Sequence, residues 1–389
     1  MAEGCIGCGG VKFSNLIRYE KFPLYFGAFP AERVSTIEAF PLEIGICLHC
    51  GLIQQTELLD ERLLDEVYKA DYYNCPSPRL SGMGVREIDK FASFFSEIDL
   101  NKGKLLEIGC FDGYLLSSLD QIGWDVYGCD PSPVINSLEK VLGQGKLQKK
   151  FFDGELYEAE TFDVVLFRNL LEHLYHPHQF LEAVRKCLKP NGHIVVDVPN
   201  VNALMEFGCY GLFFHQHITY FSLETLEKLL AKHGFAMTTS HEGNPNLFVC
   251  ASRGTSLAPR LQEVPVVKNF EEKILNQSEK IKSQIDDIFS NKENLRIGLF
   301  GASALATTLI QHIDSAAISR ITHIFDSDTE KHGKKLYGCD VKITGYERAQ
   351  GNLIDCIVIT TYFFDAEVRS HLLCEEFPSR KIVVLHESN

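Results

Sequence analysis

The stretch Leu105-Leu106-Glu107-Ile108-Gly109, followed by Asp112-Gly113-Tyr114-Leu115-Leu116, decides the fold of this chain. The first part is a short apolar strand that ends in a glycine turn, and the second part begins a helix. From Lys104 onward, short apolar strands alternate with amphipathic segments, which is typical of a doubly wound sheet. We therefore expect an α/β, Rossmann-like domain in which Gly109 and Gly113 let a ligand approach the end of the first strand.

Glu107 indicates which kind of ligand this turn accepts. The spacing E-x-G-x-x-x-G differs from the G-x-G-x-x-G of dinucleotide-binding proteins, and an acid precedes the turn. A carboxylate suits a cationic ligand, such as the sulfonium and amine of S-adenosylmethionine, better than it suits NAD. Another Rossmann-like nucleotide binder is the alternative.

Further candidate cofactor-binding residues follow the later strands. Asp130 comes directly after the strand Trp124–Cys129, where it can accept hydrogen bonds from two ribose hydroxyls. We expect Asp153 to meet the adenine amine, and Asn169 follows the fourth strand. In this order and spacing the elements resemble the class I methyltransferases over roughly residues 100–240. The resemblance implies S-adenosylmethionine as the cofactor.

Four cysteines form two CxxC pairs, Cys5 with Cys8 and Cys47 with Cys50, and a glycine follows each pair. Two such turns complete a tetrahedral site of four sulfurs, which is the closed arrangement of structural zinc. This arrangement has no position for a reactive water, so we expect the metal to hold the fold and to take no part in chemistry. A redox CxxC and incidental cysteines are the alternatives.

Composition and charge narrow the class of protein. The chain has 389 residues, of which 45% are hydrophobic and 23% charged, as in ordinary globular proteins of two or three domains. A formal net charge of −14 argues against nucleic acid and anionic membranes as partners. No apolar run is long enough to cross a bilayer, and the first residues lack the features of a signal peptide. We therefore expect a soluble, cytoplasmic protein.

The last third of the chain repeats an α/β pattern. We expect one connecting or packing helix over Asn269–Phe289, with a dimer seam as the alternative, and then a strand over Leu295–Phe300. The motif Gly298-x-x-Gly301-x-Ser303 is a weak phosphate-loop pattern, and the start of the helix that follows it can receive a phosphate. A vestigial NAD fold without ligand and a purely structural domain are the alternatives.

Several stretches resemble one subgroup of methyltransferases, the zinc-containing sugar C-methyltransferases that act on nucleotide-linked keto-deoxysugars. The resemblance rests on both CxxC pairs, on Asp71-Tyr72-Tyr73, on Glu107–Leu116 and on the stretch from His215 to Ser222. It implies an N-terminal zinc domain, a central methyltransferase domain and a C-terminal Rossmann-like domain that helps to bind a nucleotide-sugar substrate. It also places a set of residues in the active site: Tyr72, Tyr73, His215, Gln216 and His217.

The active-site stretch departs from the family at two positions. Phe214 stands where the family has tyrosine, and Gln216 stands where it has glutamate. Methylation of a carbon next to a ketone needs a base that removes the α proton, and a neutral imidazole at His217 or His215 suits that task. Gln216 can donate a hydrogen bond to a sugar oxygen. A structural role for the histidine pair is the alternative.

These observations predict four parts: a zinc-binding domain over residues 1–85, a methyltransferase domain over 86–255, a connecting helix over 256–294 and a Rossmann-like domain over 295–389. We predict C-methylation of a nucleotide-linked keto-deoxysugar by a monomer or homodimer. O-methylation of a sugar or a surface-polysaccharide precursor is the second reading, because a histidine base also activates hydroxyls. A cofactor-binding scaffold without catalysis is the third, and the intact cofactor turn argues against it.

Overall fold

The computed structural model describes residues 4–24, 27–64, 78, 84–132, 135, 142, 145–206, 213–243, 245–254, 283, 286–287, 295–347, 350–351, 353–361, 365–375, 377–378 and 382–384. It contains two compact units. The first unit comprises residues 1–15, 45–203 and 216–267, and the second comprises 16–44, 204–215 and 268–389. The predicted helix Asn269–Phe289 lies outside the described residues apart from positions 283, 286 and 287, and Tyr72 and Tyr73 lie outside them altogether.

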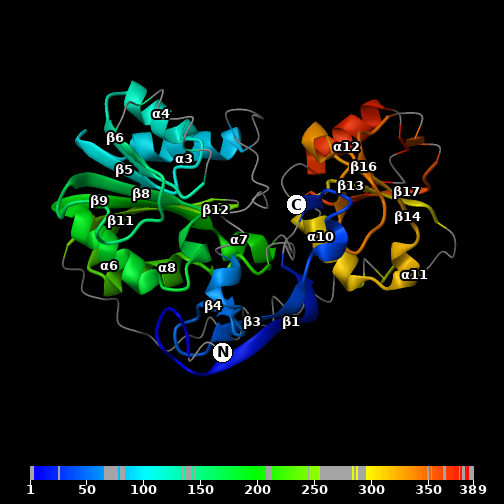
Figure 1. Ribbon diagram of the computed structural model, residues 1–389, viewed down its shortest axis with the longest axis horizontal. Coiled ribbons are helices and arrows are strands. Elements are labelled where there is room, and N and C mark those ends of the chain that lie inside the picture. Colours follow the sequence, from blue (N-terminus) through cyan, green and yellow to red (C-terminus); the bar gives the residue numbers. More distant parts are fainter. Residues whose placement is uncertain are drawn as a thin grey trace. The chain divides into compact units, whose positions relative to one another are not determined.

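The first unit is built around a seven-stranded sheet with the order β11-β12-β9-β8-β5-β6-β7 (Figure 1). Its strands are β5 (Lys104–Ile108), β6 (Asp125–Cys129), β7 (Leu147–Gln148), β8 (Phe162–Arg168), β9 (Leu188–Pro199), β11 (Phe235–Glu242) and β12 (Asn246–Arg253). The strands from β9 to β7 pair in parallel, whereas β11 and β12 add an antiparallel edge. The predicted Rossmann-like α/β fold is confirmed.

Helices cover both faces of this sheet because its central strands are apolar on both sides. On one face lie α3 (Val85–Glu97) and α4 (Tyr114–Gln121), and on the other lie α6 (Pro177–Cys187) and α8 (Leu223–Lys232) (Figure 1). Successive side chains of a strand point to opposite faces, so Leu105 joins the core under α3 and α4 while Leu106 joins the core under α6 and α8. The short helix η3 (Leu171–His173) follows β8.

A second, four-stranded sheet has the order β1-β3-β4-β10. Its strands are β1 (Phe13–Pro23), β3 (Ala39–Cys47), β4 (Ile53–Gln55) and β10 (Thr219–Tyr220). The chain passes from one unit to the other within β1, within β3 and within α7 (Val201–Glu206). Inside the first unit, β4 and β10 are antiparallel, with Gln54 opposite Thr219. This pairing joins the segment after Cys50 to the segment that carries His217.

The second unit contains a parallel five-stranded sheet with the order β16-β14-β13-β17-β18. Its strands are β13 (Ile297–Phe300), β14 (Ile321–Phe325), β16 (Ile343–Thr344), β17 (Cys356–Ile359) and β18 (Ile382–Val384). One face packs on α10 (Ala304–His312) and α11 (Ser315–Ile318), and the other on α12 (Asp365–Cys374). Short elements complete the unit: β2 (Ala28–Phe29), η1 (Val34–Thr36), η5 (Thr329–Lys331) and β15 (Lys335–Leu336).

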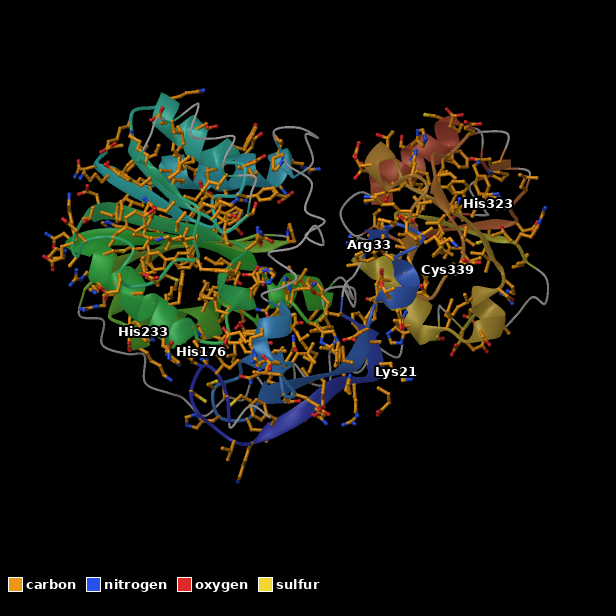
Figure 2. All side chains as sticks on the ribbon, in the orientation of Figure 1. Lys21, Arg33, His176, His233, His323 and Cys339 are labelled. Carbon is orange, nitrogen blue, oxygen red and sulfur yellow. The ribbon has the colours of Figure 1, made fainter. Side chains whose placement is uncertain are left out.

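The pairing of β2 with β15 brings an N-terminal segment into the core of the second unit. Cys339, labelled in Figure 2, is buried in the same core as Ala28 and Leu336. None of the helices that the structure describes is long and apolar enough to cross a membrane. The predicted domain boundaries at residues 85, 255 and 294 stay predictions.

Candidate cofactor, catalytic and metal sites

The turn after β5 has the backbone conformation that its glycines predict. Gly109 has a φ of +77° and Gly113 a φ of +64°, values that favour glycine over any residue with a side chain. A Cβ atom at Gly109 would meet only the side chain of Leu170, at 3.9 Å, so the space beside this backbone is open. Gly113 is also the N-cap of α4. The turn therefore combines a permissive backbone with room for a ligand.

Glu107 lies in β5 beside this turn and is only 4% exposed. Its Oε2 has no hydrogen-bond partner among the described residues. Burial raises the pKa of Glu107 to about 8, although the positive charge of Arg168 acts in the opposite direction. A buried carboxylate is unfavourable unless a cation or a donor compensates it. The site therefore fits a ligand that brings positive charge to this atom.

Asp130 follows β6, as predicted, and its two oxygens already hold the neighbouring loops. Its Oδ2 accepts from the backbone N–H of Phe111 at 3.0 Å, and its Oδ1 accepts from that of Ser132 at 2.8 Å. Burial raises the pKa of Asp130. Each carboxylate oxygen can accept a further hydrogen bond. This remaining acceptor capacity fits two ribose hydroxyls.

The other two candidate cofactor residues are exposed. Asp153 accepts a hydrogen bond from the backbone N–H of Glu155 at 2.8 Å. Asn169 has a φ of +44°, and its Oδ1 lies 3.5 Å from Nδ2 of Asn246. Its backbone N–H donates to the carbonyl of Asp197 at 2.8 Å. Both residues lie in the first unit and remain candidates.

A buried polar network under Asn169 escaped the sequence analysis. Asp197 in β9 is fully buried, and its Oδ2 accepts from Nε of Arg168 at 3.0 Å while its Oδ1 accepts from Nδ2 of Asn246 at 2.6 Å. The Arg168 guanidinium also lies over the ring of Phe91, 5.0 Å from its centroid. Arg168 and Asn246 are 78 positions apart in the sequence, so no local pattern could have joined them.

His215 has the surroundings of a core residue. It belongs to the second unit, where its Nε2 donates to the carbonyl of Phe22 at 3.2 Å. Its ring packs edge-on against Phe22 and Phe40. Burial lowers the pKa of His215 to about 4. These contacts favour the structural alternative for this histidine.

His217 lies in the first unit and is surrounded by other residues than His215. Its ring meets the ring of His173 edge-on, with 4.7 Å between the centroids, and the ring of Tyr220 at 5.8 Å. Nδ1 of His173 donates to the carbonyl of Gln216 at 2.7 Å, so Nε2 of His173 carries the lone pair. Burial lowers the pKa of His173 to about 4 and keeps this imidazole neutral. The sequence analysis missed His173.

Glu172 completes this group and was also missed. It is 1% exposed, and neither carboxylate oxygen has a hydrogen-bond partner in the described part of the chain. Its Oε1 lies 3.8 Å from Nε2 of His173, and single donor atoms of Glu172, His173 and His217 lie within 4.8 Å of one another. Burial raises the pKa of Glu172 well above its usual value. An acid and two imidazoles therefore meet at one buried place, which suits proton transfer.

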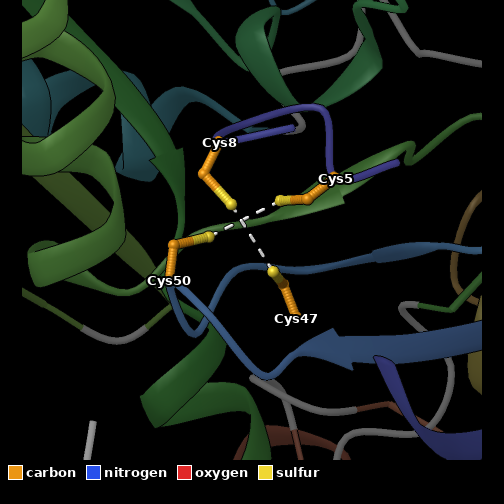
Figure 3. Close-up of side chains that lie close together, drawn as sticks. All are labelled: Cys5, Cys8, Cys47 and Cys50. Carbon is orange, nitrogen blue, oxygen red and sulfur yellow. Dashed lines mark hydrogen bonds between the residues drawn. The ribbon is translucent and has the colours of Figure 1, made fainter. Parts of the chain in front are cut away.

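The four predicted metal ligands converge, as Figure 3 shows. Sγ of Cys5 lies 3.5 Å from Sγ of Cys50, and Sγ of Cys8 lies 3.6 Å from Sγ of Cys47. Tetrahedral zinc with bonds of about 2.3 Å separates its sulfurs by about 3.8 Å, whereas a disulfide would bring them to about 2 Å. The hydrogen bond with Cys47 raises the pKa of Cys5, and the same bond lowers that of Cys47. The residues fit a structural zinc ion.

Positive charges and backbone donors surround this sulfur cluster. The ammonium of Lys228 lies 3.5 Å from the carbonyl oxygen of Cys50, and that of Lys232 lies 2.5 Å from the carbonyl oxygen of Gly7. The backbone N–H of Gly10 donates to Sγ of Cys8 at 3.3 Å. Four thiolates around a Zn²⁺ ion would carry a net negative charge, and these groups would stabilise it.

The phosphate-loop motif of the second unit is already occupied by the protein itself. Gly301 has a φ of +109°, and the backbone N–H of Ala302 donates to Oδ2 of Asp326 at 2.8 Å. The N–H of Ser303 donates to the Gly301 carbonyl at 3.0 Å, and its Oγ caps α10. Lys331 also binds Asp326, at 2.9 Å. A phosphate at this helix start would have to replace these bonds.

Two family models match the chain. Residues 82–240 match a methyltransferase domain, and residues 237–376 match a C-methyltransferase C-terminal domain. The C-methyltransferase NovU of Streptomyces niveus is 23% identical over 391 aligned residues, which cover 94% of this chain and 91% of NovU. The mitochondrial ubiquinone biosynthesis O-methyltransferase of Schizosaccharomyces pombe is 33% identical, but over only 29% of this chain and 44% of its own length.

Among solved structures, 1,6-didemethyltoxoflavin-N1-methyltransferase of Burkholderia thailandensis is similar with a TM-score of 0.41 and 16% identity. The similarity covers 55% of this chain and 96% of that protein. The family models and the nearly full-length relative confirm the prediction of a methyltransferase.

Proposed function

We propose that this S-adenosylmethionine-dependent methyltransferase transfers a methyl group to a carbon atom of a nucleotide-linked keto-deoxysugar. The observation that carries the proposal is the buried group of Glu172, His173 and His217, which supplies proton transfer in the unit that also holds the cofactor turn. The match of residues 237–376 to a C-methyltransferase domain and the full-length similarity to NovU support carbon as the acceptor.

In this proposal the first unit holds the cofactor, which supplies an electrophilic methyl group. Glu107 pairs with its positive charge, Asp130 accepts from both ribose hydroxyls, and Asp153 accepts from the adenine amine. The open space beside Gly109 allows the cofactor to approach the backbone closely. Asn169 lines the same edge of the sheet, at the end of β8.

The side chains around His217 act on the sugar. His217 takes the α proton next to the ketone, and the electron pair that remains forms an enolate. The enolate carbon would then bond to the methyl group as the methyl–sulfur bond breaks, with S-adenosylhomocysteine as the leaving group. Glu172, kept protonated by burial, donates a hydrogen bond to the developing enolate oxygen. Gln216 donates its side-chain amide to a sugar oxygen. Tyr72 and Tyr73 remain candidate active-site residues on the strength of the family resemblance.

The four cysteines, the second unit and His215 have roles outside the reaction itself. The four cysteines hold one structural zinc ion, since their sulfurs already lie near tetrahedral spacing. The second unit helps to bind the nucleotide of the substrate, although not through the loop before α10, where the N–H groups of Ala302 and Ser303 already have protein acceptors. His215 supports the fold beside Phe22.

Isotope exchange tests the proposal. A panel of dTDP-, GDP- and CDP-linked keto-deoxysugars is incubated in deuterated water with enzyme and S-adenosylhomocysteine, and label next to the ketone is measured by mass spectrometry. We expect label in one sugar of the panel, and we expect His217→Asn to abolish both exchange and methylation while cofactor affinity stays nearly unchanged. His215→Asn serves as the neighbouring control.

O-methylation is the competing outcome, and the similarity to an O-methyltransferase over part of the chain keeps it in the test. An O-methyltransferase removes no α proton, so it leaves the sugar unlabelled and forms a methyl ether. Methylation of a sugar without a ketone, with no exchange, would replace the C-methylation proposal.

A further inference from the structure

Two adjacent glutamines in β4, Gln54 and Gln55, have no part in the chemistry proposed above. Both side chains are fully buried. A buried amide is unfavourable unless protein groups replace the hydrogen bonds that it loses to water. The partners of these two amides therefore show which parts of the molecule they hold together.

Gln54 holds the first cysteine pair. Its Oε1 accepts from the backbone N–H of Ile6 at 2.7 Å, and Ile6 lies between Cys5 and Cys8. Its Nε2 donates to the carbonyl of Gln55 at 3.1 Å. The amide thus fixes the turn that carries two of the four sulfurs against β4, across 48 positions of sequence.

Gln55 holds the segment of the proposed base. Its Nε2 donates to the carbonyl of His217 at 2.6 Å, and its backbone N–H donates to the carbonyl of Ile218 at 2.9 Å. The N–H of Ile218 in turn donates to the carbonyl of Glu172 at 2.7 Å. β4 therefore fixes the backbone on which both His217 and Glu172 depend.

The second cysteine pair lies directly before β4 in the sequence. Cys50 lies three positions before Ile53, the first residue of β4. The N–H of Cys47 donates to the carbonyl of Leu52 at 2.9 Å, and Gly7 packs on the Leu52 side chain so closely that a Cβ there would come within 2.9 Å. Both halves of the sulfur cluster are thus attached to Leu52 and Gln54, which lie directly before Gln55, the residue that holds the His217 carbonyl.

We infer that Gln54 and Gln55 are positioning residues that couple occupancy of the four-cysteine site to the placement of His217. The inference rests on the proposed function, in which the site holds zinc and His217 is the base. With the metal bound, the cysteine turns hold β4 in register, and β4 holds the His217 carbonyl. When the metal leaves, the turns separate, and His217 loses its fixed position relative to the substrate.

The size of the effect follows from the sensitivity of proton transfer to distance. A misplacement of about 1 Å costs on the order of 100-fold in rate, even when its cause lies away from the reacting atoms. Zinc loss is therefore expected to lower kcat strongly while leaving cofactor affinity almost unchanged, because Glu107 and Asp130 depend on β5 and β6. A metal that only kept the whole first unit folded, without a specific link to His217, would instead lower both together as the unit unfolds.

Paired variants of Gln54 separate the coupling from a general loss of stability. Gln54→Leu removes both the acceptor for Ile6 and the donor to the Gln55 carbonyl, whereas Gln54→Glu keeps the acceptor and removes only the donor. Gln55→Leu removes the donor to His217 and leaves the cysteine turn attached. Thr238→Val, which removes the hydrogen bond from the Thr238 hydroxyl in β11 to the Cys250 carbonyl in β12, is the control outside the path.

Three readouts are measured on the full chain. Zinc release to a metallochromic dye reports on the cysteine turns. Amide hydrogen exchange at Ile218 and the imidazole NMR signal of His217, assigned with His217→Asn, report on the proposed base. Calorimetry with S-adenosylhomocysteine reports on the cofactor site.

We expect Gln54→Leu to release zinc at least about fivefold faster and to shift the His217 signal. Gln54→Glu keeps the acceptor for Ile6 but not the donor to Gln55, so it should release zinc near the wild-type rate and still shift the His217 signal. Gln55→Leu should shift the His217 signal and speed amide exchange at Ile218 with zinc release near the wild-type rate. Thr238→Val should change neither zinc release nor the His217 signal. The affinity for S-adenosylhomocysteine should stay within about twofold of wild type in all the variants.

The inference is overturned if chelation of zinc leaves the His217 signal and the exchange of Ile218 unchanged, or if elemental analysis finds no metal. A different result would overturn the proposed function alone: a coupled shift of His217 in Gln54→Leu, together with full methylation by His217→Asn, would keep the coupling but remove the base from the mechanism.

Discussion

The two α/β sheets of this protein share a framework and differ in what they can bind. In the first unit, an acid at the start of β8, Asp163, accepts from the backbone N–H of Lys104 at 2.8 Å. In the second unit, Asp355 before β17 accepts from that of Arg296 at 2.9 Å. Each pair spans 59 positions. In the first unit it aligns β5 with its parallel neighbour β8, and in the second unit it aligns β13 with its parallel neighbour β17.

The likeness extends to the loop after the first strand. Gly109 and Gly301 both have left-handed φ values, and in each unit a backbone N–H after the glycine donates to an acid that follows the second strand. The acceptor is Asp130 at 3.0 Å in the first unit and Asp326 at 2.8 Å in the second. The acid at the strand end is therefore part of the fold before it is part of any site.

The difference lies in the charges around that acid. Two positions before the glycine, the first unit has the buried acid Glu107 and the second has the apolar Leu299. Asp326 is paired with Lys331, whereas both oxygens of Asp130 bond only backbone N–H groups in the contacts that the structure describes. One framework thus carries, in the first unit, an unneutralised acid that suits the proposed cationic nucleoside and, in the second, an acid that the protein neutralises itself. The proposed difference in binding depends on a few side chains.

Loss of the metal site is expected to separate the two units most clearly. Cys47→Ser should cost the first unit several kcal/mol of stability, since structural zinc contributes on the order of 10 kcal/mol of binding free energy to folding. Hydrogen exchange in β4, to which the cysteine turns are bonded, should rise, while β17 in the second unit keeps its protection. Elemental analysis should find one zinc per chain in the wild type, and Cys374→Ser, at an exposed cysteine of α12, is the control. Metal-free protein of undiminished stability would reject the zinc assignment.

Exchanging the distinguishing residue tests the comparison directly. Glu107→Leu gives the first unit the apolar residue of the second and should weaken S-adenosylmethionine binding by about 100-fold, because a buried charge partner is worth about 2–5 kcal/mol. Isothermal calorimetry measures the loss. Leu299→Met in the second unit should leave the affinity unchanged. An unaltered Kd for Glu107→Leu would place the cofactor elsewhere.

The strand-end acids give a matched pair of substitutions. Asp130→Ala should weaken cofactor binding by about tenfold, since a hydrogen bond to a charged group contributes about 1.5–3 kcal/mol. Asp326→Ala removes the corresponding acid of the second unit and should leave this affinity intact, although it frees Lys331. Equal losses in the two variants would show that the second unit takes part in cofactor binding.

The smallest expected effect concerns pH. The pKa of Glu107 is raised to about 8 in the folded protein, so lowering the pH from 8 to 7 reduces its ionised fraction from about one half to about one tenth. Cofactor affinity should fall by about fivefold over that interval, and Glu107→Gln should flatten the profile.

The raised pKa of Glu107 has the opposite effect on the stability of the ligand-free protein, which falls as the pH rises. The folded state holds this proton more tightly than the unfolded chain does, so the contribution of Glu107 to stability is complete below its unfolded pKa, near 4.5, and is lost as the pH rises through 8. Urea unfolding of wild type and Glu107→Gln at pH 5, 7 and 9 measures it. The stability of the wild type relative to Glu107→Gln should fall as the pH rises. A relative stability that rises with pH would contradict the raised pKa.

Much of the cofactor turn and of the metal site is local, and the sequence alone predicted it. Gly109 and Gly113 are required by backbone conformation, and the spacing within each CxxC pair lets both sulfurs reach one ion. The alternation of strands and helices likewise depends on side-chain periodicity within a few turns of chain. These features need no information about distant residues, because the physical constraint acts between neighbours.

The two histidines show what only the tertiary structure decided. His215 and His217 are two positions apart and chemically identical, yet one packs between Phe22 and Phe40 and the other faces His173. Burial and partners come from strands and helices far along the chain, and they determine whether an imidazole supports a core or sits beside an acid.

The same reason explains the residues that the sequence analysis missed. Glu172 stands in an apolar stretch with no motif, and it becomes notable only because the fold buries it next to two imidazoles. The bond from Gln55 to His217 spans 162 positions, and that from Ile6 to Gln54 spans 48. The sequence determined which groups are available and how the chain turns locally, whereas desolvation and hydrogen bonding between distant segments decided which of those groups meet.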